Sequence, residues 1–123
     1  MSYLFLEKTE EFSSIGFEKH AKLLLVTDEN VKKHCYPLIQ AYLPKHQLMV
    51  IAAGDENKNI EKAQAIWNQA LEINLGRNDL IIALGGGVIS DICGFVASTY
   101  KRGMNCSYIP TSLMAMVDAA HGG

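Results

Sequence analysis

Short apolar runs alternate with stretches of helical length along this chain of 123 residues. The runs Lys22–Thr27, Gln47–Ala53, Asp79–Leu84 and Cys106–Pro110 are continuous, as in strands buried on both faces of a parallel sheet. Strands connected through helices form parallel sheets with right-handed crossovers. The pattern therefore predicts one α/β domain, a Rossmann-like parallel sheet with flanking helices, and Tyr3–Leu6 is a candidate edge strand.

Caps and helix breakers mark the first two predicted helices. Asp28 stands at an N-cap position, and the helix after it is expected to reach about Tyr42, with Pro37 kinking, delaying or breaking it. From Ile60 onward, apolar residues recur at helical spacing, and Gly76 is expected to end that helix.

Two more helices are predicted toward the end of the chain. Val88–Tyr100 is apolar on nearly every face, which indicates a helix buried between the sheet and its neighbours. Thr111–Ala119 is expected to start another helix, and the chain then stops in an apparent helix-to-loop transition. We therefore expect a chain cut off before a further domain.

Composition argues against several classes of function. The net charge is −2, so no strong attraction to nucleic acid is expected. The apolar runs are too short to span a bilayer, and the N-terminus lacks the basic leader of a signal peptide. Three cysteines, Cys35, Cys93 and Cys106, form no CxxC pair and indicate reduced thiols in a cytoplasmic protein.

Three glycines, Gly85 to Gly87, join a predicted strand to a predicted helix. Glycine permits positive φ and close approach of a ligand, and the helix N-terminus favours an anion such as pyrophosphate. The spacing differs from GxGxxG, so a tight turn needed only for packing explains the glycines equally well. Asp91, expected in the first helical turn, either stabilises that helix end or accepts hydrogen bonds from a ribose or a carboxamide.

Polar residues follow the first two predicted strands, at Thr27–Asn30 and Gly54–Lys58. Ligands of open α/β sheets bind at this edge, although each cluster alone is more often a solvated loop with a helix cap. Lys58 could place an ammonium beside a phosphate or a ribose. Asp118 lies among apolar residues, which indicates a polar site because an unpaired buried carboxylate is costly. The histidines His20, His34, His46 and His121 show no metal-ligand spacing, and no nucleophile–base pair is apparent.

Taken together, these stretches resemble the 3-dehydroquinate synthase family. The matching strings are VTDENV, AGDENKN, IALGGGVISDICGFVASTYKRG and IPTSLMAMVDAAHGG, which occur in family order over essentially the whole chain. The resemblance implies a phosphate-eliminating, NAD-dependent lyase of the shikimate pathway, acting on 3-deoxy-D-arabino-heptulosonate 7-phosphate. In that family NAD removes a hydride from a ring hydroxyl and later returns it, and a divalent metal, zinc or cobalt, is expected only in the complete enzyme.

The resemblance also implies roles for individual residues. It implies substrate contacts for Arg102 and Asp118. The residues that it implies contact the cofactor are Asp28, Asn30, Asp55, Glu56, Lys58, Gly86, Gly87, Val88, Asp91, Thr111 and Ser112.

Departures from the family pattern keep other interpretations open. Ser90 replaces a common glycine, Ser112 replaces a threonine, and Ala119-Ala120-His121 replaces a serine-serine-aliphatic run beside the substrate. Another sugar phosphate cyclase is one alternative. An iron-containing alcohol or glycerol dehydrogenase and a non-catalytic nucleotide-binding module are two others. The family's downstream lysine and metal ligands lie beyond Gly123, so we expect the chain to fold around NAD without catalysing, and the family's habit raises the expectation of a homodimer.

Overall fold

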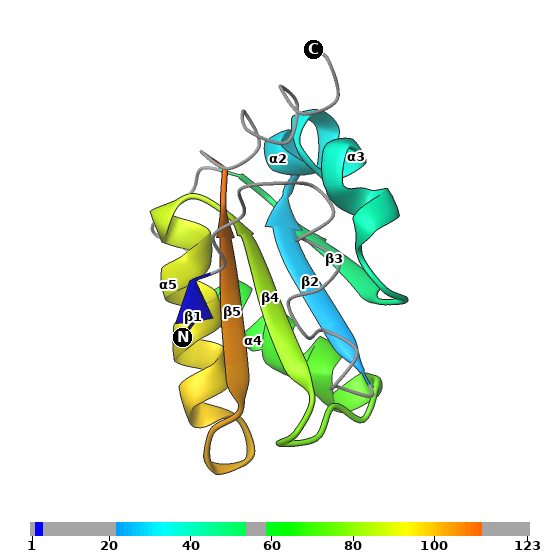
Figure 1. Cartoon of the computed structure of the whole chain (residues 1–123). Helices are drawn as coiled ribbons and strands as arrows, with labels where there is room; N and C mark the ends of the chain where they lie inside the picture. Colours follow the sequence, from blue (N-terminus) through cyan, green and yellow to red (C-terminus); the bar gives the residue numbers. More distant parts are fainter. Residues whose placement is uncertain (1, 4–21, 54–58, 112–123) are drawn as a thin grey trace.

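The computed structural model describes residues 2–3, 22–53 and 59–111. An open parallel sheet of five strands, in the order β1-β5-β4-β2-β3, forms its centre (Figure 1). The predicted α/β class is confirmed, and the predicted strands within the described residues are found with ends shifted by at most two residues. The strands are β1 (Ser2–Tyr3), β2 (Leu23–Asp28), β3 (Gln47–Ile51), β4 (Leu80–Gly85) and β5 (Asn105–Pro110).

The predicted edge strand is present in part. Ser2 and Tyr3 pair in parallel with Ser107 and Tyr108 of β5, at the edge of the sheet. The remainder of that prediction, residues 4–6, lies outside the described residues.

The first helical region is broken where the proline predicts it. It consists of α2 (Glu29–His34), α3 (Tyr36–Ile39) and the 3-10 turn η2 (Gln40–Tyr42). The Val31 N–H donates to Asp28 Oδ1 at 2.8 Å, so Asp28 is the predicted N-cap. Pro37 is the second residue of α3 and lies in its first turn, where its missing N–H leaves no helical bond unmade.

The second helix, α4 (Asn59–Glu72), ends before the predicted glycine. Asn74 takes the left-handed conformation, with φ 56°, which asparagine tolerates better than most residues. The Lys22 ammonium donates to the carbonyls of Ile73 and Asn74, which satisfies acceptors at the carboxyl end of α4. The prediction that Gly76 ends this helix is therefore wrong.

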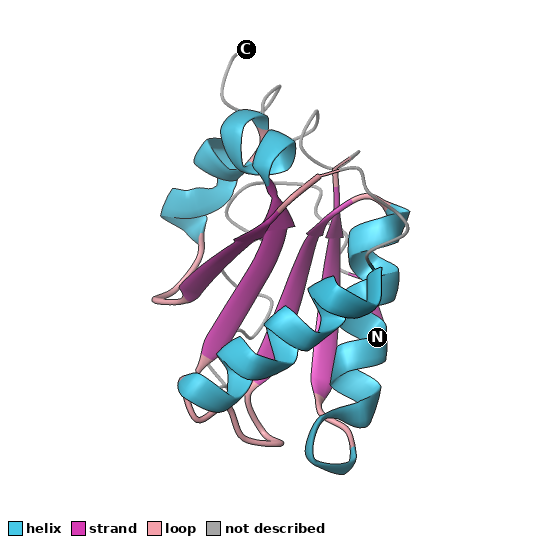
Figure 2. Ribbon diagram, turned by 180° about the vertical axis from the view of Figure 1, so that it is seen from behind, coloured by secondary structure: helices cyan, strands magenta, loops and turns pink. Residues whose placement is uncertain are grey.

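The third helix, α5 (Gly87–Thr99), packs beside α4 on one face of the sheet, as Figure 2 shows, and is followed by the 3-10 turn η4 (Tyr100–Arg102). Apolar residues of β2 alternate between that face, with Leu24 and Val26, and the opposite face, with Leu23 and Leu25. Burial of α5 on nearly every face was predicted, but Phe95 is 56% exposed. Its ring lies 6.3 Å from that of Trp67, at a surface that no other described element covers.

No helix within the described ranges is long and apolar enough to cross a membrane. The predicted helix Thr111–Ala119 lies outside these ranges except for Thr111.

Candidate nucleotide-binding site

The glycine turn between β4 and α5 contains glycines of two kinds. Gly85 has φ 158°, and a Cβ there would lie 3.0 Å from Ile89 Cγ1, so packing requires a glycine. Gly86 has φ −88°, an ordinary value for any residue, and a Cβ built at Gly86 or Gly87 meets no described residue within 4 Å. Packing therefore explains Gly85, whereas Gly86 and Gly87 leave open space next to the start of a helix.

The turn is held in place by the strands on either side of β4. The Tyr108 hydroxyl of β5 donates to the Gly85 carbonyl at 2.6 Å, and the Thr111 N–H approaches the same carbonyl at 3.4 Å. On the other side, the fully buried Thr27 hydroxyl of β2 donates to the Leu84 carbonyl at 2.8 Å. Neither Tyr108 nor Thr27 was predicted to support the site, because their partners are set by strand pairing rather than by a local motif.

The start of α5 has hydrogen-bond donors that no described side chain caps. Its N-cap, Gly86, provides no side-chain cap, and the first N–H bonded within the helix is that of Ser90, to the Gly86 carbonyl at 3.1 Å. The N–H groups of the preceding turn of a helix have no partner within the helix. An anion above Gly86 and Gly87 would meet these donors and the positive end of the helix dipole.

A hollow of about 250 Å³ lies directly above this turn. We call it the glycine-turn hollow. It spans the carboxyl ends of β2, β3 and β4, and it is smaller than the ~300–1,000 Å³ of pockets that enclose a complete small ligand. It has room for part of a nucleotide, such as a phosphate with its sugar. Its lining residues are Asp28, Ile51, Ala52, Ala53, Lys62, Gly86, Gly87, Val88 and Ile89.

The hollow lies where the strand connections reverse direction. From β2 the chain proceeds to β3 on one side, then crosses to β4 and β5 on the other side of β2. In open α/β sheets, ligands bind outside the carboxyl ends of the strands at such a switch point. Topology and local geometry thus indicate the same place.

Four of the predicted cofactor residues meet in this hollow: Asp28, Gly86, Gly87 and Val88. Asp28 Oδ1 already caps α2, and no described residue hydrogen-bonds to its second carboxylate oxygen. Thr111 lies beside the turn through its contact with the Gly85 carbonyl.

Two predicted residues are elsewhere on the same edge. Asn30 is exposed in the first turn of α2 and does not line the hollow. Asp91 is exposed and does not line the hollow either. The prediction that Asp91 lies in the first helical turn is wrong: α5 starts at Gly87, so Asp91 is its fifth residue.

Five predicted site residues lie outside the described part of the chain: Asp55, Glu56, Lys58, Ser112 and Asp118. Lys62 lines the hollow but was not predicted. Its signal in the sequence is weak, because a lysine on an amphipathic helix is normally a solvated side chain.

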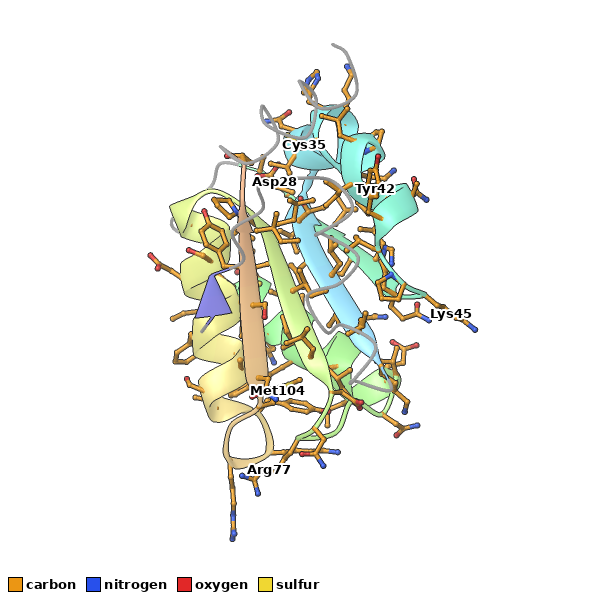
Figure 3. All side chains as sticks on the ribbon, viewed as in Figure 1. Asp28, Cys35, Tyr42, Lys45, Arg77 and Met104 are labelled. Atoms are coloured by element: carbon orange, nitrogen blue, oxygen red, sulfur yellow. The ribbon has the colours of Figure 1, made fainter. Side chains whose placement is uncertain are left out.

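Arg102 lies at the opposite end of the sheet. It lines a hollow of about 540 Å³ together with Arg77 and Asn105, before the start of β5, and Figure 3 shows Arg77 far from Asp28. From Asn105 to Pro110 the strand rises roughly 16 Å, at about 3.3 Å per residue, which exceeds the reach of an arginine side chain. Arg102 and the glycine-turn hollow of the same chain therefore do not form one site.

The cysteines offer no nucleophile near the hollow. Burial raises the pKa of the Cys106 thiol to about 11 and raises that of Cys93 well above its usual value. Both remain protonated at neutral pH, and all three cysteines are free of disulfides. Within the described ranges, no group of His, Cys, Asp and Glu side chains could hold a metal ion.

Comparisons with known proteins place the chain in a family. Residues 48–123 match the model of the 3-dehydroquinate synthase N-terminal domain. A 3-dehydroquinate synthase from Prochlorococcus marinus strain NATL1A is 44% identical over 93% of the chain and 32% of its own length. One from Parabacteroides distasonis is 42% identical over 94% of the chain and 33% of its own length.

Solved structures show the same architecture. A 2-deoxy-scyllo-inosose synthase complexed with carbaglucose-6-phosphate, NAD+ and Co2+ matches 89% of the chain and 31% of its own length, with a TM-score of 0.75 at 20% identity. A 2-epi-5-epi-valiolone synthase from Streptomyces hygroscopicus with NAD+ and Zn2+ bound matches 97% of the chain and 35% of its own length. Its TM-score is 0.73 at 28% identity.

The fold is a Rossmann-like domain, and its solved structural neighbours are sugar phosphate cyclases. Within that class, the chain belongs to the 3-dehydroquinate synthase family. It spans about a third of the length of the relatives that it matches.

Proposed function

We propose that this chain binds NAD, with the cofactor's pyrophosphate at the glycine turn. The observation that carries the proposal is the open space at Gly86 and Gly87, where an added Cβ would meet no described residue within 4 Å and would lie at the hollow. The free N–H groups at the start of α5 suit phosphate oxygens, and the second carboxylate oxygen of Asp28 suits a ribose hydroxyl. The bound NAD supplies reversible hydride transfer.

We further propose that the whole protein is a cytoplasmic 3-dehydroquinate synthase of aromatic amino acid biosynthesis. It would convert 3-deoxy-D-arabino-heptulosonate 7-phosphate to 3-dehydroquinate and phosphate. Relatives of that name at 40–44% identity support this assignment. Because the chain spans about a third of those relatives, substrate binding and metal binding would depend mainly on residues beyond it. The chain alone is therefore expected to bind cofactor without turning over substrate.

Calorimetry with NAD and NADP tests the cofactor. We expect binding of NAD with weaker binding of NADP, because the carboxylate of Asp28 would repel a 2′-phosphate in the hollow. Equal or tighter binding of NADP would contradict the assignment.

Phosphate release tests the activity. The 123-residue chain should release no phosphate from the heptulosonate phosphate when NAD and zinc or cobalt are supplied. Adding the missing portion of a related synthase, in the same chain or separately, should restore release. Turnover by the short chain would contradict the expected dependence on the missing portion.

A second candidate function is that of a sugar phosphate cyclase with a different product, and one observation favours it. Both structures described above come from cyclases that form other rings, and one of them is 28% identical to this chain. Supplying the completed enzyme with a hexose phosphate and a heptulose phosphate in parallel would separate these activities by product.

A further inference from the structure

One side chain in the glycine-turn hollow has no role in the predicted site. Lys62, the fourth residue of α4, is half-buried and lines the hollow beside Gly86, Gly87 and Asp28. It is the only basic residue among those that line this hollow in the described part of the chain. Lys62 and the open N-terminus of α5 thus border the same space.

The position of Lys62 does not stabilise its own helix. A cation near the start of a helix is repelled by the positive end of the helix dipole. Its neighbours three and four residues away in the sequence are Lys58, Asn59, Ala65 and Ile66, so α4 offers no carboxylate at the spacing of a helical ion pair. Within the described residues, no salt bridge to Lys62 is present, and the one carboxylate in the lining, Asp28, already caps α2.

An anion in the hollow would change this balance. The free N–H groups of α5 and the ammonium of Lys62 would approach a phosphate from two different helices. Charge-assisted hydrogen bonds of this kind are about twice as strong as neutral ones. Partial burial of Lys62 limits screening by solvent ions, which makes the pair more favourable than one at the surface.

We propose that Lys62 is a nucleotide-binding residue whose ammonium pairs with a phosphoryl oxygen of the dinucleotide held at the glycine turn. This inference rests on the proposed binding of NAD and adds a specific residue to it. Lys62 acts on the phosphate rather than on the base or the sugar, so its contribution depends on the charge of the ligand.

Calorimetry of the 123-residue chain with ADP, NAD and adenosine tests the contact. Lys62→Gln removes the charge but keeps most of the side chain. This variant should bind ADP and NAD about tenfold more weakly, and its affinity for adenosine should be unchanged. Lys62→Arg should keep most of the affinity. Lys101→Gln makes the same charge change just after the far end of α5 and is the matched control. It should leave the affinities for ADP, NAD and adenosine unchanged.

The outcomes separate this inference from the function on which it rests. If the unchanged chain binds neither ADP nor NAD, the proposed function fails, and the contact fails with it. If the unchanged chain binds both and Lys62→Gln binds them equally well, only the contact is overturned. An equal loss of affinity for adenosine would also overturn the proposed phosphate contact, because the Lys62 side chain would then act by packing.

Discussion

The two ends of the sheet use their polar groups in opposite ways. At the amino end, the buried carboxylate of Asp79 accepts hydrogen bonds from the N–H groups of Lys22 and Gly76, at 3.0 and 2.8 Å. The Tyr100 hydroxyl donates to the Leu75 carbonyl at 2.6 Å. These side chains satisfy the backbone of the loops that they join.

At the carboxyl end, side chains fix the glycine turn from below but leave its upper side open. Tyr108 and Thr27 hold the carbonyls of Gly85 and Leu84, while the first N–H groups of α5 receive no side-chain cap. The hollow here, about 250 Å³, is smaller than the one of about 540 Å³ at the amino end. Open donors on a rigid frame, rather than the size of a hollow, therefore distinguish the proposed ligand site.

The largest expected effect is the loss of NAD binding in Gly87→Val. The Cβ of the new side chain would meet no described residue within 4 Å, and the side chain would take up space at the hollow, so affinity should fall roughly 100-fold or more, equivalent to about 3 kcal/mol. Calorimetry measures the affinity, and circular dichroism with thermal melting should show a nearly unchanged fold.

The matched control is Gly85→Ala in the same turn. Its Cβ would lie 3.0 Å from Ile89 Cγ1, so this variant should lose about 1–3 kcal/mol of stability. If Gly87→Val unfolds the chain instead, the glycines serve packing alone and the contrast between the two ends disappears.

The next effect concerns the amino end. Asp79→Ala removes the acceptor for two backbone N–H groups, and it should lower the free energy of unfolding by about 2 kcal/mol. Urea unfolding measures this loss. The affinity for NAD of the folded fraction should stay the same, and Asp79→Asn, which keeps one acceptor, should lose less stability. A selective loss of NAD affinity would show that the two ends are coupled.

The smallest effect is expected for Arg102→Ala. Because Arg102 lies beyond the amino end of β5, NAD affinity should remain within about twofold of the unchanged chain, since surface substitutions far from a site contribute little. In the completed enzyme, a role at the substrate phosphate still predicts weaker substrate binding. A large loss of NAD affinity would contradict the position of Arg102 described here.

Most of the fold was predictable because its signals are local. Four apolar runs gave the strands, Asp28 marked a helix start, and Pro37 marked a break. The end of α4 was mispredicted because Asn74 adopts the left-handed conformation that glycine more often supplies. For the site, the glycines were found from their spacing and from the family resemblance.

The roles within the glycine turn could not be separated from the sequence. All three residues of the turn are glycines, but only at Gly85 would an added Cβ crowd Ile89. Tyr108 and Lys62 escaped prediction for the same reason: they lie at the glycine turn between β4 and α5, and only the tertiary structure brings this turn next to β5 and α4.

The open space at Gly86 and Gly87 has a consequence for the fate of variants in a cell. Chaperones and proteases remove proteins according to the fraction that unfolds. A Cβ added at either residue meets no described residue within 4 Å, so a small substitution there should leave the unfolded fraction nearly unchanged and the variant should not be removed. The cell would then accumulate a long-lived protein without its cofactor, and measurements of protein abundance would give no sign of the defect.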